Sequence, residues 1–192
     1  ENMMKKSFSQ IPVQSIAFRA LGTLNTIEMP EPEGGQGMEL LRKVRDAVFS
    51  LDDRLSVFKE ESEISAVNRA AGEDRVTVSE STFSLVLNSV YYARMTGGLF
   101  DVTAGPLVRL WGIGKKGDFI PSDEEILEAC ELVNYQDIIF EGPSPFRIGL
   151  KMKGESLDLG GIAKGYAADL AVKMLKEGGA EEALLDFGGT VS

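Results

Sequence analysis

The sequence predicts an α+β fold, in which mixed or antiparallel sheets pack against helices. Segments with helical spacing of apolar residues and short segments rich in β-branched residues both occur along the chain. They follow one another without the strand–helix–strand rhythm of a doubly wound parallel sheet. The chain has 192 residues, of which 43% are hydrophobic and 26% charged, so it can bury a core without disulfide bonds.

The first elements are predicted by a change of period along the sequence. Residues 16–29 are rich in β-branched and apolar types and predict one or two strands around Gly22. Between Met38 and Leu55 apolar residues recur at helical spacing with charges between them, which predicts an amphipathic helix. Ser62 is placed to cap a short helix after it.

The next helix begins at Ser79 or Ser81 and ends at the glycine pair 97–98, as helices with glycine C-caps do. A short strand at 75–79 precedes it, and the aperiodic segment 99–121 predicts an ordered loop after it. We expect the following residues on the apolar face of this helix: Phe83, Val86, Leu87, Val90 and Tyr91.

A capping box from Ser122 to Glu125 predicts the start of a further helix. A Gly-Pro turn at Gly142 separates two segments of strand composition. The remaining predicted elements are a strand pair over 135–141 and 145–154, a helix over 162–177 and a buried strand over 182–190.

Composition excludes several kinds of chemistry. The net charge of −10 argues against a broad nucleic-acid surface, because phosphate backbones select an excess of Lys and Arg. The sequence contains no histidine, so histidine acid–base catalysis and histidine metal sites are absent from it. Catalysis must rely on carboxylates, lysine, hydroxyls, backbone groups or a hard metal ion. Cys130 is the only cysteine, and we expect it to be buried and inert.

The sequence gives little information on localisation. No apolar run approaches the ~20 residues of a membrane span. The first residues, ENMMKKSFSQ, lack the apolar core of a signal peptide. Membrane association would therefore require an anchor that is not part of this sequence.

The stretch DLGGIAKG, residues 158–165, is a candidate anion site. Gly160 and Gly161 allow a tight turn and a close approach of the backbone to a ligand. A helix that begins just after them presents free N–H groups, and Lys164 adds positive charge. Asp158 would then need a hydroxyl, an amide or a metal ion beside it. In the alternative interpretation, Asp158 accepts hydrogen bonds from local amides and Lys164 is a solvated surface residue.

Two further segments are candidates for binding a planar ring. Phe100 and Asp101 follow a glycine pair, and an aromatic residue next to an acid can stack on a ring and bond its polar edge. Alternatively, Phe100 is buried and Asp101 forms an Asx turn. Phe58 precedes a short predicted helix with polar residues, which in the alternative is a capped helix on a solvated face.

GIGKKG, residues 112–117, matches G-x-G-x-x-G only superficially. A dinucleotide-binding motif needs a strand before it and a helix that opens within it, and the sequence predicts neither. A flexible glycine and lysine loop is the better interpretation.

Together, five stretches in order resemble the ApbE family of flavin transferases, which are FAD:protein FMN transferases. The resemblance spans residues 21–190. It depends on LGT at 21–23, RLSVFKEESEISAVN at 54–68, TGGLFDVTAGPLV at 96–108, LDLGGIAKGYAAD at 157–169 and ALLDFGG at 183–189.

The resemblance implies an α+β flavin transferase that uses FAD and Mg²⁺. Such an enzyme transfers FMN to a threonine hydroxyl of a target flavoprotein and releases AMP. The backbone carbonyl of Gly161 would bind the metal. The residues implied to contact FAD are Leu21, Phe58, Leu99, Phe100, Asp101, Asp158 and Lys164.

The resemblance leaves the catalytic base unassigned. In the family, an aspartate and a threonine that bind the metal and a histidine-containing segment lie further along the chain. We therefore expect residues 1–192 to be the N-terminal portion of a single ApbE-like domain whose C-terminal part is missing. Two alternatives stay open: a Mg²⁺-dependent FAD pyrophosphatase that forms FMN and AMP, and a non-catalytic flavin-binding module.

Overall fold

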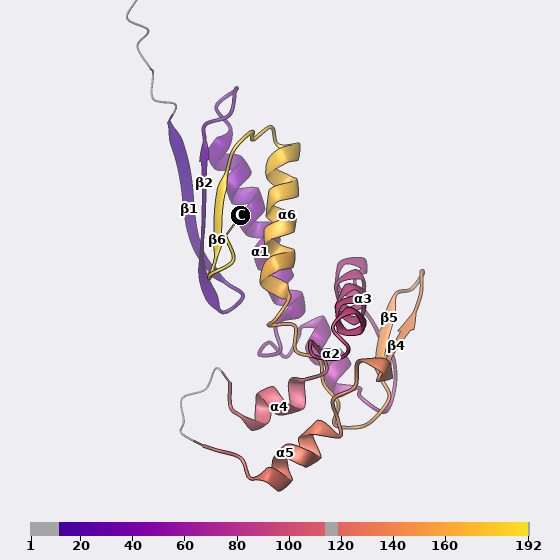
Figure 1. The fold of residues 1–192 in the computed structure, drawn as a ribbon. Helices are drawn as coiled ribbons and strands as arrows, with labels where there is room; N and C mark the ends of the chain where they lie inside the picture. The colour runs from indigo at the N-terminus through magenta and orange to yellow at the C-terminus, as the bar shows by residue number, and fades with distance from the viewer. Residues whose placement is uncertain (1–11, 114–118, 192) are drawn as a thin grey trace, which may run out of the picture. The chain divides into compact units, whose positions relative to one another are not determined.

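The computed structural model describes residues 12–113 and 119–191, so most of the GIGKKG loop lies outside the described residues. It contains helices and two three-stranded sheets, and every pair of neighbouring strands is antiparallel (Figure 1). The predicted α+β class is confirmed. The chain divides into two compact units, one made of residues 1–49 and 167–192 and the other of residues 50–166.

The first unit contains one sheet, in the strand order β1-β2-β6. Its strands are β1 (Val13–Ala20), β2 (Thr23–Pro30) and β6 (Leu184–Phe187). Parts of α1 (Gly37–Leu55) and α6 (Ala163–Glu177) lie on one face of this sheet (Figure 1).

A two-residue turn joins β1 to β2. Leu21 and Gly22 have φ angles of 54° and 74°, as a type I′ hairpin turn requires. Glycine adopts this conformation readily, whereas leucine does so at a cost. The side-chain amide of Asn25 braces the turn by donating to the carbonyl of Ala20 at 3.1 Å.

The core of the first unit lies between the sheet and the helices. Phe18 makes edge-on contacts with Phe49 and Phe187, with ring centroids 5.5 and 6.3 Å apart. Leu185 and Phe187 are buried, but Leu184 is exposed. The prediction of a buried strand here was therefore only half right, because one face of the sheet is open to solvent in this unit.

The second unit contains the other sheet, in the order β3-β5-β4, and short helices. The elements are α2 (Glu63–Arg69), β3 (Val76–Thr77), α3 (Glu80–Met95), α4 (Gly105–Leu110), α5 (Asp123–Cys130), the 3₁₀ turn η1 (Tyr135–Asp137), β4 (Ile138–Glu141) and β5 (Arg147–Leu150). Their N-caps confirm three predictions, since Ser62, Ser79 and Ser122 each accept a hydrogen bond from the first turn of a helix.

Three expectations about this unit were wrong. The segment predicted to be a loop contains α4, in which Pro106 occupies a first-turn position that suits its missing N–H. Leu87 and Tyr91 of α3 are exposed, because the buried face of this helix runs through Leu85, Val86, Ser89, Val90 and Ala93. Cys130 is exposed at the end of α5.

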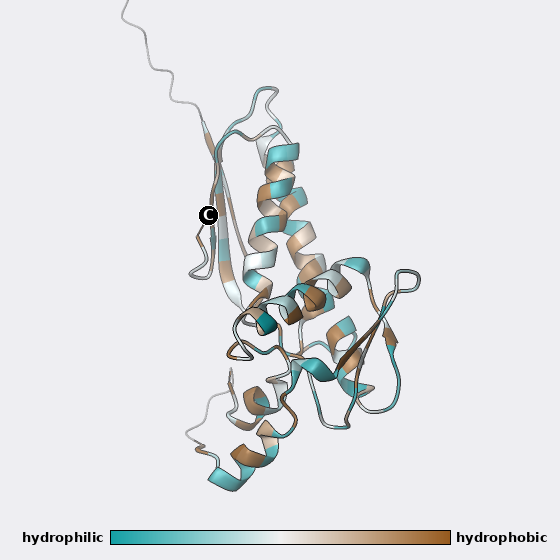
Figure 2. Ribbon diagram, turned by 45° about the vertical axis from the view of Figure 1, so that its right-hand side comes forward, coloured by the Kyte–Doolittle hydropathy of each residue, from teal (hydrophilic) through white to brown (hydrophobic). Residues whose placement is uncertain are grey.

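The helices carry polar and apolar residues along their length, as Figure 2 shows by colour. Among the described residues, no helix combines the length and the apolar character needed to cross a membrane.

Candidate functional site

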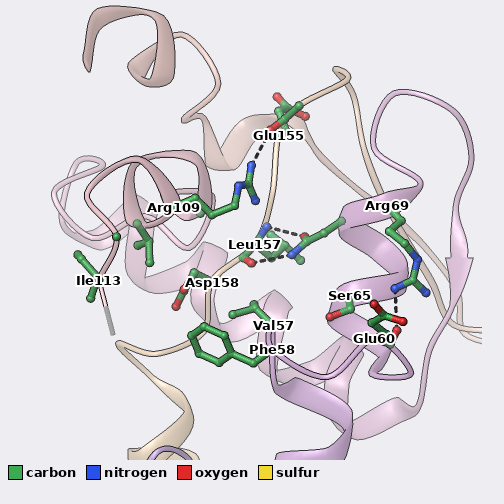
Figure 3. Close-up of a pocket in the computed structure, with 15 residues that line it drawn as sticks. Val57, Phe58, Glu60, Ser65, Arg69, Arg109, Ile113, Glu155, Leu157 and Asp158 are labelled. Atoms are coloured by element: carbon green, nitrogen blue, oxygen red, sulfur yellow. Dashed lines mark hydrogen bonds between the residues drawn. The ribbon is translucent and has the colours of Figure 1, made fainter. Parts of the chain in front are cut away.

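The second unit contains a pocket of about 490 Å³ (Figure 3). Its wall is formed by residues 57–60 with α2, by α4 and the residues just after it, and by the extended segment 154–158. This volume is in the range of small-molecule sites. Phe58 and Asp158, two residues that the family resemblance implies for FAD, both line it.

The segment that carries Asp158 is fixed from two sides. On one side, Asn68 of α2 exchanges two hydrogen bonds with Leu157: its amide nitrogen donates to the carbonyl at 2.9 Å, and its amide oxygen accepts from the backbone N–H at 2.7 Å. On the other side, the N–H of Asp158 donates to the carbonyl of Val102 at 2.8 Å. Asp158 is therefore held where the TGGLFDVT and DLGGIAKG motifs meet.

Asp158 itself is partly exposed, and its Oδ1 accepts the N–H of Gly160 at 2.8 Å. This is the local amide contact of the alternative interpretation. It occupies one carboxylate oxygen, and the side chain still lines the pocket.

Gly160 and Gly161 are needed for space and not for conformation, because neither has a positive φ. A Cβ at Gly161 would lie 3.1 Å from Cε2 of Phe100, and a Cβ at Gly160 would lie 3.0 Å from Oδ1 of Asp158. The expected tight turn is present, since the N–H of Ile162 donates to the carbonyl of Leu159 at 3.0 Å across the two glycines. The close approach of this backbone to a ligand stays a prediction. The half-buried ring of Phe100 lies against the backbone of Gly161.

The carboxylate of Asp101 accepts hydrogen bonds from Thr103 and Tyr135. Its Oδ1 accepts the backbone N–H and the hydroxyl of Thr103, at 2.8 and 2.6 Å, and its Oδ2 accepts the N–H of Tyr135 at 2.9 Å. The Asx-turn interpretation describes these contacts. The predicted contact of Asp101 with FAD stays a prediction, as does that of Leu99, whose side chain is 94% exposed.

The other predicted residues differ in their surroundings. Phe58 is 74% exposed at the wall of the pocket. Lys164 is not part of the wall, and its Nζ lies 3.4 Å from the carbonyl oxygen of Gly160. Leu21 belongs to the first unit, in the strained turn described above. The FAD contacts of these three residues also stay predictions.

Sequence reasoning missed two residues at the pocket. Arg109 of α4 donates to Oγ of Ser156 at 2.6 Å and to the carbonyl of Gly154 at 3.4 Å. Glu155 is buried, and its Oε2 accepts the N–H of Met152 at 2.9 Å. Burial raises the pKa of Glu155, and the nearby Asp137 raises it further. Arg109 directly follows the motif at 96–108, and Glu155 lies two residues before the motif at 157–169, but no local signal showed that α4 turns Arg109 toward Ser156.

The described residues do not form a magnesium site by themselves. They contain no cluster of three or more acidic or cysteine side chains that could hold a metal ion. Gly161 offers one carbonyl, whereas Mg²⁺ takes six oxygen ligands and is usually bound through carboxylates.

Comparison with known proteins decides the family. The model of the ApbE family matches residues 21–192, which is most of the chain. The chain belongs to the ApbE family. The predicted resemblance is thus confirmed, and three of its five motifs, at 54–68, 96–108 and 157–169, contribute residues to the pocket.

Named relatives agree with this assignment. The chain is 34% identical over 152 residues to an FAD:protein FMN transferase of Klebsiella pneumoniae, covering 79% of this chain and 48% of the relative. It is 28% identical over 174 residues to an FAD:protein FMN transferase of Vibrio cholerae, covering 89% of this chain and 51% of the relative. The chain therefore spans about half the length of these curated ApbE relatives.

Solved ApbE structures share the fold. The flavin transferase ApbE from Vibrio cholerae matches with a TM-score of 0.84 at 26% identity, covering 94% of this chain and 59% of that one. The ApbE protein from Thermotoga maritima matches with a TM-score of 0.82 at 30% identity, covering 94% and 58%.

Proposed function

We propose that the complete protein is an FAD:protein FMN transferase and that the pocket of the second unit binds part of FAD. The observation that carries this proposal is the meeting of two family motifs at one pocket. Phe58 and Asp158 line the pocket, and Phe100 lies against Gly161 beside it. Membership of the ApbE family supports the same reaction.

In the proposed reaction, the hydroxyl oxygen of an acceptor threonine attacks the phosphorus of the FMN half of FAD. A phosphoester bond forms between that oxygen and the phosphorus. The bond from the phosphorus to the bridging oxygen breaks, and AMP leaves with that oxygen. The hydroxyl proton passes to a base, which we do not assign to a residue of this chain.

The pocket residues would bind and orient the dinucleotide. The exposed ring of Phe58 offers an aromatic face for stacking. The carboxylate of Asp158 can accept a hydrogen bond from a hydroxyl or an amine of the ligand. Its position is fixed, because the backbone of Asp158 bonds to Val102 and that of Leu157 bonds to Asn68. Phe100, Leu99, Asp101, Lys164 and Leu21 complete the set of proposed FAD contacts.

The proposed reaction depends on Mg²⁺, and we propose one ligand to this ion from the described residues. The carbonyl of Gly161 is the one ligand that this chain is proposed to contribute. The remaining oxygen ligands would come from water, from the phosphates of FAD and from further residues of the complete protein.

The test is an acceptor assay with the complete natural protein. It is incubated with FAD, Mg²⁺ and a candidate acceptor flavoprotein, and the acceptor is analysed by intact mass spectrometry. We expect one FMN to be added per acceptor, with release of one AMP. Replacing the acceptor threonine by valine should abolish the addition, and chelation of Mg²⁺ should stop it.

Other outcomes identify the alternatives. AMP released at the same rate without any acceptor indicates an FAD pyrophosphatase. Bound FAD with no AMP and no adduct across a panel of acceptors indicates a non-catalytic flavin-binding module. Either result contradicts the proposed transferase.

A further inference from the structure

The wall of the pocket carries a cation that the family resemblance did not indicate. Arg109 lines the same pocket as Phe58 and Asp158, and it is exposed. Figure 3 shows its side chain extending from α4 toward the segment that contains Glu155. Its guanidinium group is therefore available to a ligand in the pocket.

Neutral acceptors fix the position of this guanidinium group. Nη1 donates to the hydroxyl oxygen of Ser156 at 2.6 Å, and Nη2 donates to the carbonyl of Gly154 at 3.4 Å. No carboxylate of the described residues forms an ion pair with Arg109. The group thus keeps an uncompensated positive charge, and a guanidinium has five N–H donors, more than these two contacts use.

The pocket needs such a cation if it is to hold an anion. Glu60, Glu155 and Asp158 are also part of its wall, and carboxylates repel phosphate groups. Lys164, the cation that the sequence suggested, is not part of the wall, and its Nζ faces the carbonyl of Gly160.

Arg69 is the other arginine of the wall. Its Nη1 donates to the carbonyl of Glu60 at 2.6 Å, so its guanidinium lies beside a residue with a carboxylate of its own. Arg109 instead bonds to the segment directly before Leu157 and Asp158. This contact couples the position of its charge to the position of the proposed FAD contact.

We propose that Arg109 binds the phosphate groups of the flavin nucleotide in this pocket. The inference rests on the proposed function, and it assigns to Arg109 the phosphate recognition first expected of Lys164. A guanidinium presents two parallel N–H groups that match two phosphate oxygens, a geometry that lysine cannot offer.

The experiment compares two flavins that differ in their phosphate groups. The complete natural protein is titrated with FAD and with riboflavin, which has no phosphate, and binding is followed by flavin fluorescence. Arg109→Gln should weaken FAD binding by about tenfold or more, the effect of losing a charge-assisted hydrogen bond. Its riboflavin affinity should change by less than about twofold, and Arg109→Lys should weaken FAD binding to an intermediate extent.

Arg69→Gln is the matched control, because it removes the other guanidinium group of the same wall. We expect it to leave the ratio of FAD to riboflavin affinity within about twofold of the wild type. A second measurement does not depend on riboflavin: raising the salt concentration should weaken FAD binding less in Arg109→Gln than in the wild type, because salt screens the charge that this variant lacks.

Several results would overturn the inference. If Arg109→Gln weakens both flavins equally, with unchanged salt dependence, Arg109 only braces Ser156. If Arg69→Gln lost as much FAD affinity relative to riboflavin as Arg109→Gln, the effect would come from the total charge of the wall and not from Arg109 itself. If Arg109→Gln binds FAD as tightly as the wild type does, only this inference is contradicted. If the wild type binds no flavin, the proposed function is contradicted.

Discussion

The hairpin turn of the first unit and the pocket segment of the second unit are held in place in different ways. The turn at Leu21 and Gly22 depends on neighbours in the sequence, since Asn25 braces it. The segment 156–158 depends on distant residues: Asn68, which bonds Leu157, is 89 positions away. Contacts between sequence neighbours thus position Leu21, whereas contacts between distant residues position Asp158.

The largest expected effect is on the pocket segment, where Gly105 packs against Ser156. Gly105 donates its N–H to the carbonyl of Ser156 at 3.2 Å, and a Cβ at Gly105 would lie 2.2 Å from Oγ and 2.5 Å from the carbonyl oxygen of Ser156. Gly105→Ala should therefore lower the free energy of unfolding by roughly 2–3 kcal/mol, as overpacking does. Urea denaturation measures the change, and flavin binding should be lost with it.

Gly165→Ala provides the control for this prediction. Gly165 lies in α6, and a Cβ there would meet nothing within 4 Å. This substitution should raise stability by up to about 1 kcal/mol, because alanine favours the helix. If both alanine variants changed stability equally, the steric account of Gly105 would be wrong.

The second effect concerns the link from α2 to the pocket segment. Asn68→Ala removes both hydrogen bonds to Leu157 and leaves a buried backbone group to find new partners. We expect a loss of about 2 kcal/mol in the free energy of unfolding and weaker FAD binding. Arg69→Ala, at the next position of α2, should cost much less because Arg69 is exposed. Equal losses in both variants would contradict the special role of Asn68.

The same contrast explains what could be predicted from the sequence. Caps and hairpins were predictable, because Ser62, Ser122 and Gly22 act on residues within a few positions. The buried face of α3 and the short helix α4 were not, since packing against other elements decides them. Likewise, the motifs identified Phe58 and Asp158, but only the fold shows that Arg109 reaches Ser156.

The third prediction tests the local nature of the hairpin turn. Leu21→Asn should raise the free energy of unfolding by up to about 1 kcal/mol, because asparagine tolerates the positive φ of 54° better than leucine. Thermal unfolding measures this gain. If Leu21 contacts FAD as proposed, the same variant should bind FAD more weakly despite its higher stability. Lower stability in Leu21→Asn would show that contacts of the leucine side chain outweigh the strain of its backbone.

The smallest effect is the pH dependence that Glu155 gives to the segment just before Ser156. Burial and the nearby Asp137 raise the pKa of Glu155 in the folded protein. The folded state therefore binds this proton more tightly than the unfolded state does, so the contribution of Glu155 to stability is present at low pH. It is lost as the pH rises from the ordinary glutamate pKa, about 4.3, through the raised value.

Glu155→Gln stays neutral, so its stability relative to the wild type should increase over this range. Urea denaturation at several pH values measures the difference, with Glu73→Gln, an exposed glutamate, as the control. If the difference in the free energy of unfolding between Glu155→Gln and the wild type were the same at every pH, Glu155 would titrate with an ordinary pKa. The hydrogen bonds to Asn68 and Val102 would then hold the pocket segment whatever the charge of Glu155.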